Sequence, residues 1–382
     1  MIVVHKWRRL LCRCDELNET VHEKVVLCES GNKPPKSQFL HAAMNVIRFG
    51  GKGLIFAQYT TNYLEETEEI CEFVECKRQI PLVYVDIEIG TMISIYIRNA
   101  KNPVAKITAT TTVIGSTVYS PKVASFSSRG PNVLIPSILK PDIAAPGVSI
   151  LASLGKSFGF KSGTSMAAPH ITGIVALLKS LHPDWSPAEI KSAIVTTASV
   201  TNRYGMPIKA EGVPRKLADP FDFGGGQVDP NRAADPGLVY DIDPKDYKEI
   251  FKCTYGTDTI CSKTQKTGYI LNLPSITIPD LKKASPVKVS RTLKNVGKGT
   301  DVNGVYRVSF QTPPGIKMVV KPEVLVFDAD NMVQKFEVVL SCNIEVQGDY
   351  TFGSLTWSDT KHFVRIPVSV RPVLQDLYAD VA

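Results

Sequence analysis

The stretch "KSGTSMAAPH", residues 161–170, places a serine between a glycine-containing turn and a long apolar run. The apolar residues that follow recur at helical spacing, so we expect a helix that begins near Thr164 and ends before Pro183. These residues are Ile171, Ile174, Val175, Leu177, Leu178 and Leu181. The free N–H groups and the positive dipole end of a helix N-terminus stabilise an oxyanion that forms beside them. Ser165 is therefore a candidate nucleophile, with backbone support for the oxyanion from Gly163, Thr164 and Ser165 itself.

Two interpretations of this serine follow from the residues alone. The triplet Gly163-Thr164-Ser165 is also what an ordinary N-cap before a core helix looks like. Against that, Pro169 lies too deep to be a first helical residue, so its missing N–H leaves the Ser165 carbonyl without its helical donor and should bend the helix. A helix selected only for packing would rarely accept that proline.

Composition excludes several classes of function. The chain has 382 residues, a net charge of +7 and scattered Lys and Arg residues, so we expect no nucleic-acid partner. No apolar run reaches the roughly 18–20 residues of a membrane span, and the basic patch near the N-terminus follows the apolar residues, the reverse of a signal peptide. The eight cysteines lack paired CxxC spacing, so we expect neither a metal nor a cofactor, and both free thiols and a few disulfides remain open.

Three regions differ in their hydrophobic pattern. Residues 24–108 alternate strand-like runs with helical stretches, which indicates a small α/β or α+β domain. Residues 109–262 contain expected strands at "KVASFSS" and "DIAAPGVSIL", the helix at Thr164, and a second helix with Ser186 as its N-cap, Pro187 at N1 and Glu189 completing a capping box. The Gly-Gly-Gly and Asp-Pro repeats of 219–244 indicate an ordered loop. From 286 to 370, seven short period-two strands predict a β-sandwich.

The extended motif Gly-Thr-Ser-x-Ala-x-Pro-His resembles the active-serine motif of the subtilisin-like serine proteases (subtilases). The stretches "SFSSRGPN", "LKPDIAAPGVSILA", "HPDWSPAEIKSAIVTTA", "FDFGGGQVDPNRAADPGLVYD" and "LNLPSITIP" resemble the plant, cucumisin-like branch of that family.

The resemblance implies an α/β fold: the C-terminal half of a subtilase parallel-sheet catalytic domain at 109–262, preceded by a protease-associated (PA)-like domain at 12–108. A fibronectin-III-like β-sandwich at 270–372 follows, and residues 1–11 match nothing. It also implies peptide-bond hydrolysis through an acyl-enzyme on Ser165.

The rest of the family's catalytic triad has no counterpart here. In subtilases the Asp and His precede the inserted domain, and no Asp-Ser/Thr-Gly or His-Gly-Thr-His motif occurs in this sequence. The oxyanion asparagine is absent too, because neither Asn32 nor Asn132 lies in its motif. Asp142 in "LKPD" corresponds to a strand beneath the site, so we expect a structural role. The chain is therefore expected to be an N-terminally truncated subtilase that is inactive alone.

None of the six histidines lies in a catalytic motif. His170 is five helical residues from Ser165, a rotation of about 140° that turns it to another face. The other five are His5, His22, His41, His182 and His362.

Three hypotheses remain open. The chain is the C-terminal part of a serine endopeptidase with polypeptide substrates, a non-catalytic interaction protein that uses its PA-like and sandwich domains, or a product without function. A parallel-sheet domain without its N-terminal half exposes the apolar face of the serine helix, so we expect a protein partner or the missing half to cover it. The resemblance implies an extracellular or cell-wall location, although we expect no signal peptide in this sequence.

Overall fold

The alternation of apolar strands and amphipathic helices near the N-terminus produces an α/β layer structure. The computed structural model describes residues 2–4, 21–30, 35–60, 80–109, 120–212, 215–255, 271–283, 285–297, 302–342 and 348–373. It divides into two compact units, the first comprising Met1–Ser125, Leu151–Phe160 and Lys209–Lys216, and the second Phe126–Ile150, Lys161–Ile208 and Leu217–Ala382. His5, Asn32, Cys12, Cys14, Cys71, Cys76 and Cys261 lie outside the described residues.

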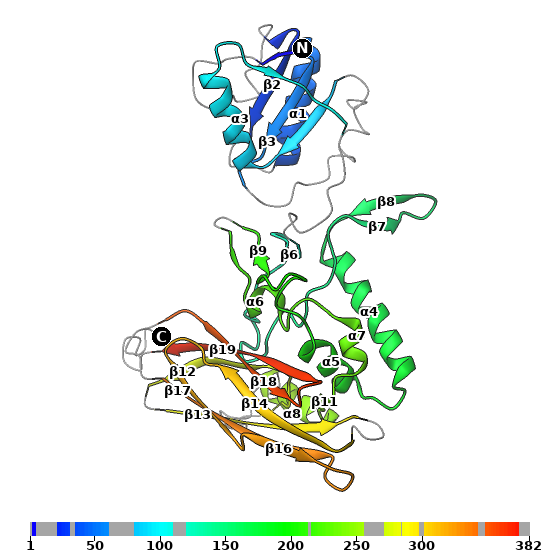
Figure 1. Ribbon diagram of the computed structural model, residues 1–382, viewed down its shortest axis with the longest axis vertical. Helices are drawn as coiled ribbons and strands as arrows, with labels where there is room; N and C mark the ends of the chain where they lie inside the picture. Colours follow the sequence, from blue (N-terminus) through cyan, green and yellow to red (C-terminus); the bar gives the residue numbers. More distant parts are fainter. Residues whose placement is uncertain are drawn as a thin grey trace. The chain divides into compact units, whose positions relative to one another are not determined.

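The first unit is a five-stranded sheet in the order β4-β3-β2-β1-β5 with helices α1 and α3 (Figure 1). The elements are β1 (Ile2–Val4), β2 (Lys24–Glu29), α1 (Pro35–Arg48), β3 (Gly53–Ala57), β4 (Leu82–Val85), α3 (Ile87–Asn99) and β5 (Val104–Ala105). Strands β1 to β4 are parallel and β5 is antiparallel to β1. The predicted elements of 24–108 are confirmed, and β1 adds a strand from the stretch 1–11 that sequence comparison left unmatched.

Alternate residues of the sheet pack on opposite helices, as the two-residue period of a strand requires. Val26, Cys28, Leu54 and Phe56 pack with α1, whereas Val25, Ile55 and Ala57 pack on the face that holds Ile93 of α3. Strand β3 is buried along its whole length, as is typical of a parallel strand covered on both faces.

The second unit contains the predicted β-sandwich. Its two sheets have the orders β11-β13-β17-β15 and β12-β19-β18-β14-β16. All seven predicted strands are present: β13 (Val287–Asn295), β14 (Gly304–Gln311), β15 (Ile316–Lys321), β16 (Val324–Phe327), β17 (Val333–Cys342), β18 (Thr351–Ser358) and β19 (Phe363–Val373). Strands β11 (Leu238–Val239) and β12 (Ile276–Lys282) extend the sheets beyond them. Trp357 fills the centre and contacts the ring of Phe336 edge-on, with centroids 5.2 Å apart.

The two strands expected at 122–128 and 142–151 differ from their predictions. The expected strand at 122–128 forms only β6 (Lys122–Val123), which pairs with β9 (Lys209–Ala210), and β10 (Lys216–Leu217) completes that small sheet. The expected strand at 142–151 makes isolated bridges at Ile143 and Ala144 and then enters a hairpin of β7 (Ile150–Ser153) and β8 (Phe158–Lys161). Pro141 and Pro146 flank the bridges and supply no N–H to a ladder, so the long strand was predicted wrongly.

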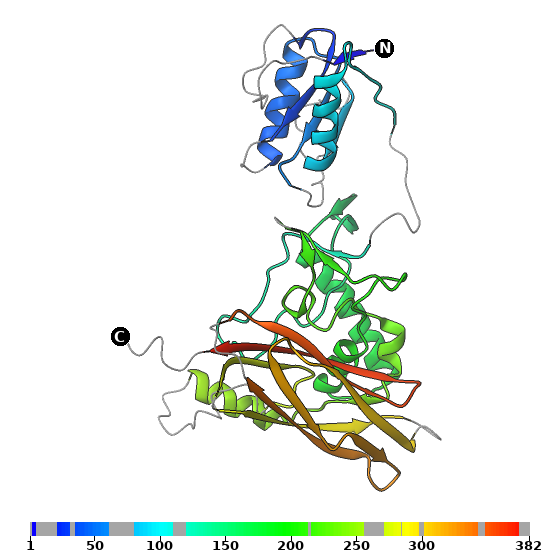
Figure 2. The same ribbon diagram turned by 60° about the vertical axis from the view of Figure 1, so that its left-hand side comes forward.

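Two short helices interrupt the predicted ordered loop at 219–244, which is otherwise mostly loop. Asp219 and Asp229 each accept an N-cap hydrogen bond, and the proline after each occupies N1 of α6 (Pro220–Phe223) or α7 (Pro230–Ala234). Helix α8 (Pro244–Tyr255) follows at the edge of the sandwich (Figure 2). An Asp-Pro pair is a helix-start signal as well as a turn signal, which is why the loop prediction missed these two helices.

The described helices include none that is both long enough and apolar enough to cross a membrane.

A buried histidine fastens the turn after α7 to the sandwich. His362 Nδ1 lies 2.9 Å from Oδ2 of Asp359, and His362 Nε2 lies 3.2 Å from Oδ2 of Asp235. Burial opposes ionisation of Asp359, but hydrogen bonds from His362 outweigh it and lower the pKa of this carboxyl. Gly237 has a φ of +74°, and a Cβ there would lie 2.5 Å from the hydroxyl of Tyr306. The turn therefore requires glycine at 237, and Asp359 holds the histidine that contacts it.

This arrangement predicts acid-sensitive stability. A lowered carboxyl pKa contributes stability that is fully present above the unfolded value of about 3.9 and is lost as the pH falls through the folded value. Between pH 5 and pH 2.5, wild type should lose more unfolding free energy than Asp359→Asn, measured by urea denaturation at each pH. Asp330→Asn, which removes an exposed carboxylate on the β16–β17 turn, is the control and should follow wild type. Equal acid slopes for wild type and Asp359→Asn would contradict the assignment.

Candidate functional site

The start of helix α4 (Thr164–Leu181) is held in place by the loop at residues 147–149. The N–H of Gly163 donates to the Gly147 carbonyl at 2.8 Å, and the Ser149 N–H donates to Oγ of Ser162 at 2.9 Å. Gly147 approaches so closely that a Cβ on it would lie 2.9 Å from the Gly163 carbonyl oxygen and 3.1 Å from Cβ of Ala167. These contacts fix the first turn of α4 against the loop at residues 147–149.

Ser165 is the second residue of α4 and its side chain is exposed, as is that of Thr164. The N–H groups of Met166 and Ala167 both donate to the Gly163 carbonyl, at 3.0 and 3.3 Å. The N–H groups of Thr164 and Ser165 precede these bonds and have no acceptor inside the helix. The predicted nucleophile and the predicted oxyanion donors thus lie together at an exposed helix N-terminus, the arrangement that favours an anion.

Pro169 lies inside α4, which continues through it to Leu181. Its ring nitrogen has no proton to donate to the Ser165 carbonyl, so the backbone at the nucleophile lacks one helical hydrogen bond. The remainder of the helix is anchored by Ile171, Ile174, Val175 and Leu178, which pack with Trp185 and Ile190.

The histidines of the second unit that the structure describes are engaged elsewhere. His170 Nδ1 lies 2.8 Å from the carbonyl of Met166, so its ring turns back on its own helix. His182 Nε2 lies 2.9 Å from the Ala234 carbonyl, and its ring stacks on Trp185 at 3.8 Å. His362 belongs to the Asp235–Asp359 cluster of the sandwich. The described residues of this unit bring no imidazole into a hydrogen bond with Ser165.

Asp142 forms ion pairs and does not bond to a histidine among the described residues. Its carboxylate lies 2.6 Å from Nζ of Lys191 and 2.5 Å from Nζ of Lys140. Burial opposes ionisation, but the ammonium groups of Lys191 and Lys140 outweigh it and lower the pKa of Asp142. Its carbonyl also accepts the Gly225 N–H at 2.9 Å, which fits the structural role expected of it.

A sequence motif identifies Ser165, but it does not identify the roles of the residues that position it. Gly147 and Ser162 act through close approach and one side-chain hydrogen bond, and neither stands out in a local pattern. Asn132 accepts the N–H groups of Leu134 and Ile135 through its own side chain, so it caps a turn.

Comparison with known proteins matches two parts of the chain to known families. Residues 93–224 match the model of the subtilase family, and residues 270–370 match the model of a fibronectin type-III domain. The chain is 46% identical over 389 residues to subtilisin-like protease SBT3.9 of Arabidopsis thaliana, covering 96% of this chain and 49% of the relative. It is 48% identical over 381 residues to subtilisin-like protease SBT3.7 of the same plant, covering 95% of this chain and 47% of the relative.

Residues 93–224 belong to the subtilase family, and nearly the whole chain is similar to subtilisin-like proteases of a plant. It spans about half the length of the curated relatives that it matches. The subtilase match includes the start of α4 with Ser165, and the fibronectin match coincides with the sandwich.

The packing at the start of α4 generates a stability prediction. Gly147→Ala should lower the free energy of unfolding by about 1–3 kcal/mol, because backbone must shift to admit the methyl group. Gly173→Ala is the matched control: Gly173 lies within α4, a Cβ there meets nothing within 4 Å, and the change should be neutral or stabilising by up to about 1 kcal/mol. Thermal unfolding followed by circular dichroism compares the two. The same melting temperature for both variants would refute the close contact.

Proposed function

We propose that Ser165 is the nucleophile of a serine-type endopeptidase. The observation that carries this proposal is the exposed Ser165 at the second position of α4, beside N–H groups that lack intrahelical acceptors, in a chain of the subtilase family. In the proposed reaction Oγ attacks the carbonyl carbon of a peptide bond while its proton passes to a base. The Thr164 and Ser165 N–H groups support the oxyanion. The C–N bond then breaks, the amine leaves with the proton, and water hydrolyses the ester.

The base is proposed to come from a polypeptide segment that packs along α4. The described histidines of the second unit bond to carbonyls or carboxylates away from Ser165. A groove of about 410 Å³ runs between α4 and α5 (Pro187–Thr196), lined by apolar side chains that include Ile171, Val175, Trp185, Ile190 and Ile194. A segment that carries a histidine and an aspartate and fills this groove would complete the triad. The expectation that the chain is inactive alone follows from this arrangement.

Polypeptides are the proposed substrates, since the matched relatives are named as proteases. An extracellular or cell-wall location is proposed as well. The disulfide of buried Cys28 supports it, because disulfides persist in oxidising compartments. The identity of residues 12–108 as a PA-like domain remains part of the proposal.

A non-catalytic interaction protein is the second candidate. It is favoured by one observation, that the described histidines nearest in sequence to Ser165 are held by carbonyl groups. In that case the α/β unit and the sandwich would serve as binding domains.

Labelling of Ser165 by a fluorophosphonate probe separates the two candidates. We expect no labelling of the purified chain, because the described histidines of the second unit do not contact the hydroxyl and a serine without a base is a poor nucleophile. Co-expression with the half of SBT3.9 that lies outside the alignment should produce labelling and hydrolysis of a peptide substrate. Both should be lost in Ser165→Ala.

Ser180→Ala is the matched control, since it removes an exposed hydroxyl near the other end of the same helix. It should retain labelling. Labelling that persists in Ser165→Ala would overturn the assignment of the nucleophile. A stable complex of the two halves without labelling would favour the interaction protein.

A further inference from the structure

A second concave site lies on the other side of α5, away from the serine helix. This pocket has a volume of about 640 Å³, within the range of about 300–1,000 Å³ of small-molecule sites. Its floor consists of Ile135, Ile138, Ile250, Leu271 and Leu273, all members of one apolar cluster with α8. We call it the lysine-rimmed pocket. An apolar floor of this kind accepts an aliphatic chain rather than a polar ligand.

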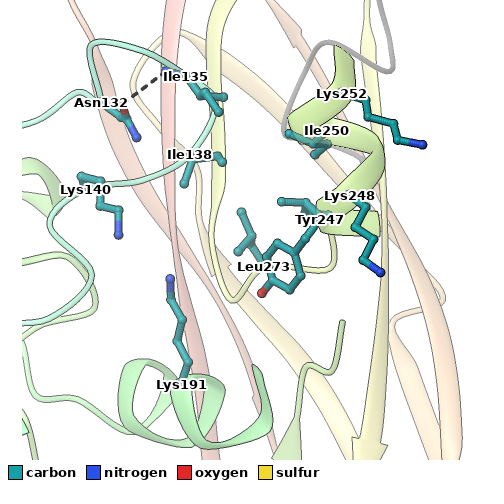
Figure 3. A pocket seen from close by; sticks show the side chains of 11 residues that line it. Asn132, Ile135, Ile138, Lys140, Lys191, Tyr247, Lys248, Ile250, Lys252 and Leu273 are labelled. Atoms are coloured by element: carbon teal, nitrogen blue, oxygen red, sulfur yellow. Dashed lines mark hydrogen bonds between the residues drawn. The ribbon is translucent and has the colours of Figure 1, made fainter. Parts of the chain in front are cut away.

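One end of the lysine-rimmed pocket carries two ammonium groups. Lys140 and Lys191 point these groups toward each other there (Figure 3). Both pair with the single carboxylate of Asp142, at 2.5 and 2.6 Å. An ammonium group has three N–H donors, so each lysine keeps donors beyond its bond to Asp142. The carboxylate of a ligand can accept these remaining donors.

A neutral donor lies near the same end. The Tyr247 ring lies over the pocket beside Leu273 (Figure 3). Burial, and then the carboxylates of Asp241 and Asp142, raise the pKa of Tyr247, so its hydroxyl keeps its proton and remains a donor. Lys248 and Lys252 also line the pocket, but their ammonium groups point away from the apolar side chains (Figure 3). The polar groups therefore converge on one end only, as in a site for a ligand with one charged head.

We propose that the lysine-rimmed pocket binds an amphipathic monocarboxylate of the free fatty-acid type. The carboxylate lies at Lys140 and Lys191, and the aliphatic chain lies over Ile138, Ile250 and Leu273. This site is separate from Ser165 and does not depend on proteolytic activity.

Isothermal titration calorimetry on the whole chain tests the proposal with octanoate, decanoate and dodecanoate, each below its micellar concentration. The dissociation constant should fall by about fivefold or more for each two added methylenes, because each methylene leaves water. The uncharged alcohol 1-decanol should bind about tenfold more weakly than decanoate, since it makes no charged contact. Equal binding of decanol and decanoate, or no saturable heat with any of the acids, would overturn the proposal. This test uses only the unsubstituted chain, so it does not depend on the folding of a variant.

Two lysine variants locate the head group. Lys191→Met should weaken decanoate binding by about tenfold, whereas Lys252→Met, which removes an ammonium group that points away, should change it by less than about twofold. Far-ultraviolet circular dichroism checks that both variants fold. Equal weakening by the two substitutions would place the charge recognition elsewhere and refute the stated pose.

Discussion

The second unit depends most on the ion pair and the hydrogen bond that the buried carboxylate of Glu189 forms. Its side chain is only 2% exposed, and it accepts the backbone N–H of Ser186 and an ammonium proton of Lys294, each at 2.8 Å. A buried carboxylate is tolerated only when it is paired and hydrogen-bonded. These contacts fix the start of α5 and fasten it to β13 of the sandwich. Ser192 on the same helix accepts the N–H of Tyr240 and adds a second point of attachment.

The position of Ser165 follows from this attachment. Ile190 and Ile194 of α5 pack with Ile171 and Leu178 of α4, so the serine helix rests on a helix that the sandwich holds. Arg365 of β19 donates to the Gly225 carbonyl at 3.2 Å, and the N–H of Gly225 donates in turn to the Asp142 carbonyl. The sandwich is therefore part of the support of the candidate site.

The features that sequence predicted well are those encoded within a few residues. Ser186, Pro187 and Glu189 form the predicted capping box because all of its donors and acceptors lie within one turn. The sandwich strands were predictable because burial alternates along them, as in β13. The ion pair of Glu189 with Lys294 joins residues 105 positions apart, so no local sequence pattern predicts it. The strand predicted at 142–151 failed for a related reason, since a strand needs partners that its own residues do not specify.

The composition of α4 indicates a helix with more apolar surface than the rest of the second unit covers. A helix that is hydrophobic on all sides is typical of a protein interior. One side of α4 packs through Ile171, Ile174 and Leu178, yet Leu177 and Leu181 are 65% and 59% exposed. A polypeptide that fills the groove at Val175 would bury further apolar surface of this helix and so stabilise the folded state. Because Ser165 begins the same helix, we infer that a segment in this groove would both stabilise α4 and supply the proposed base.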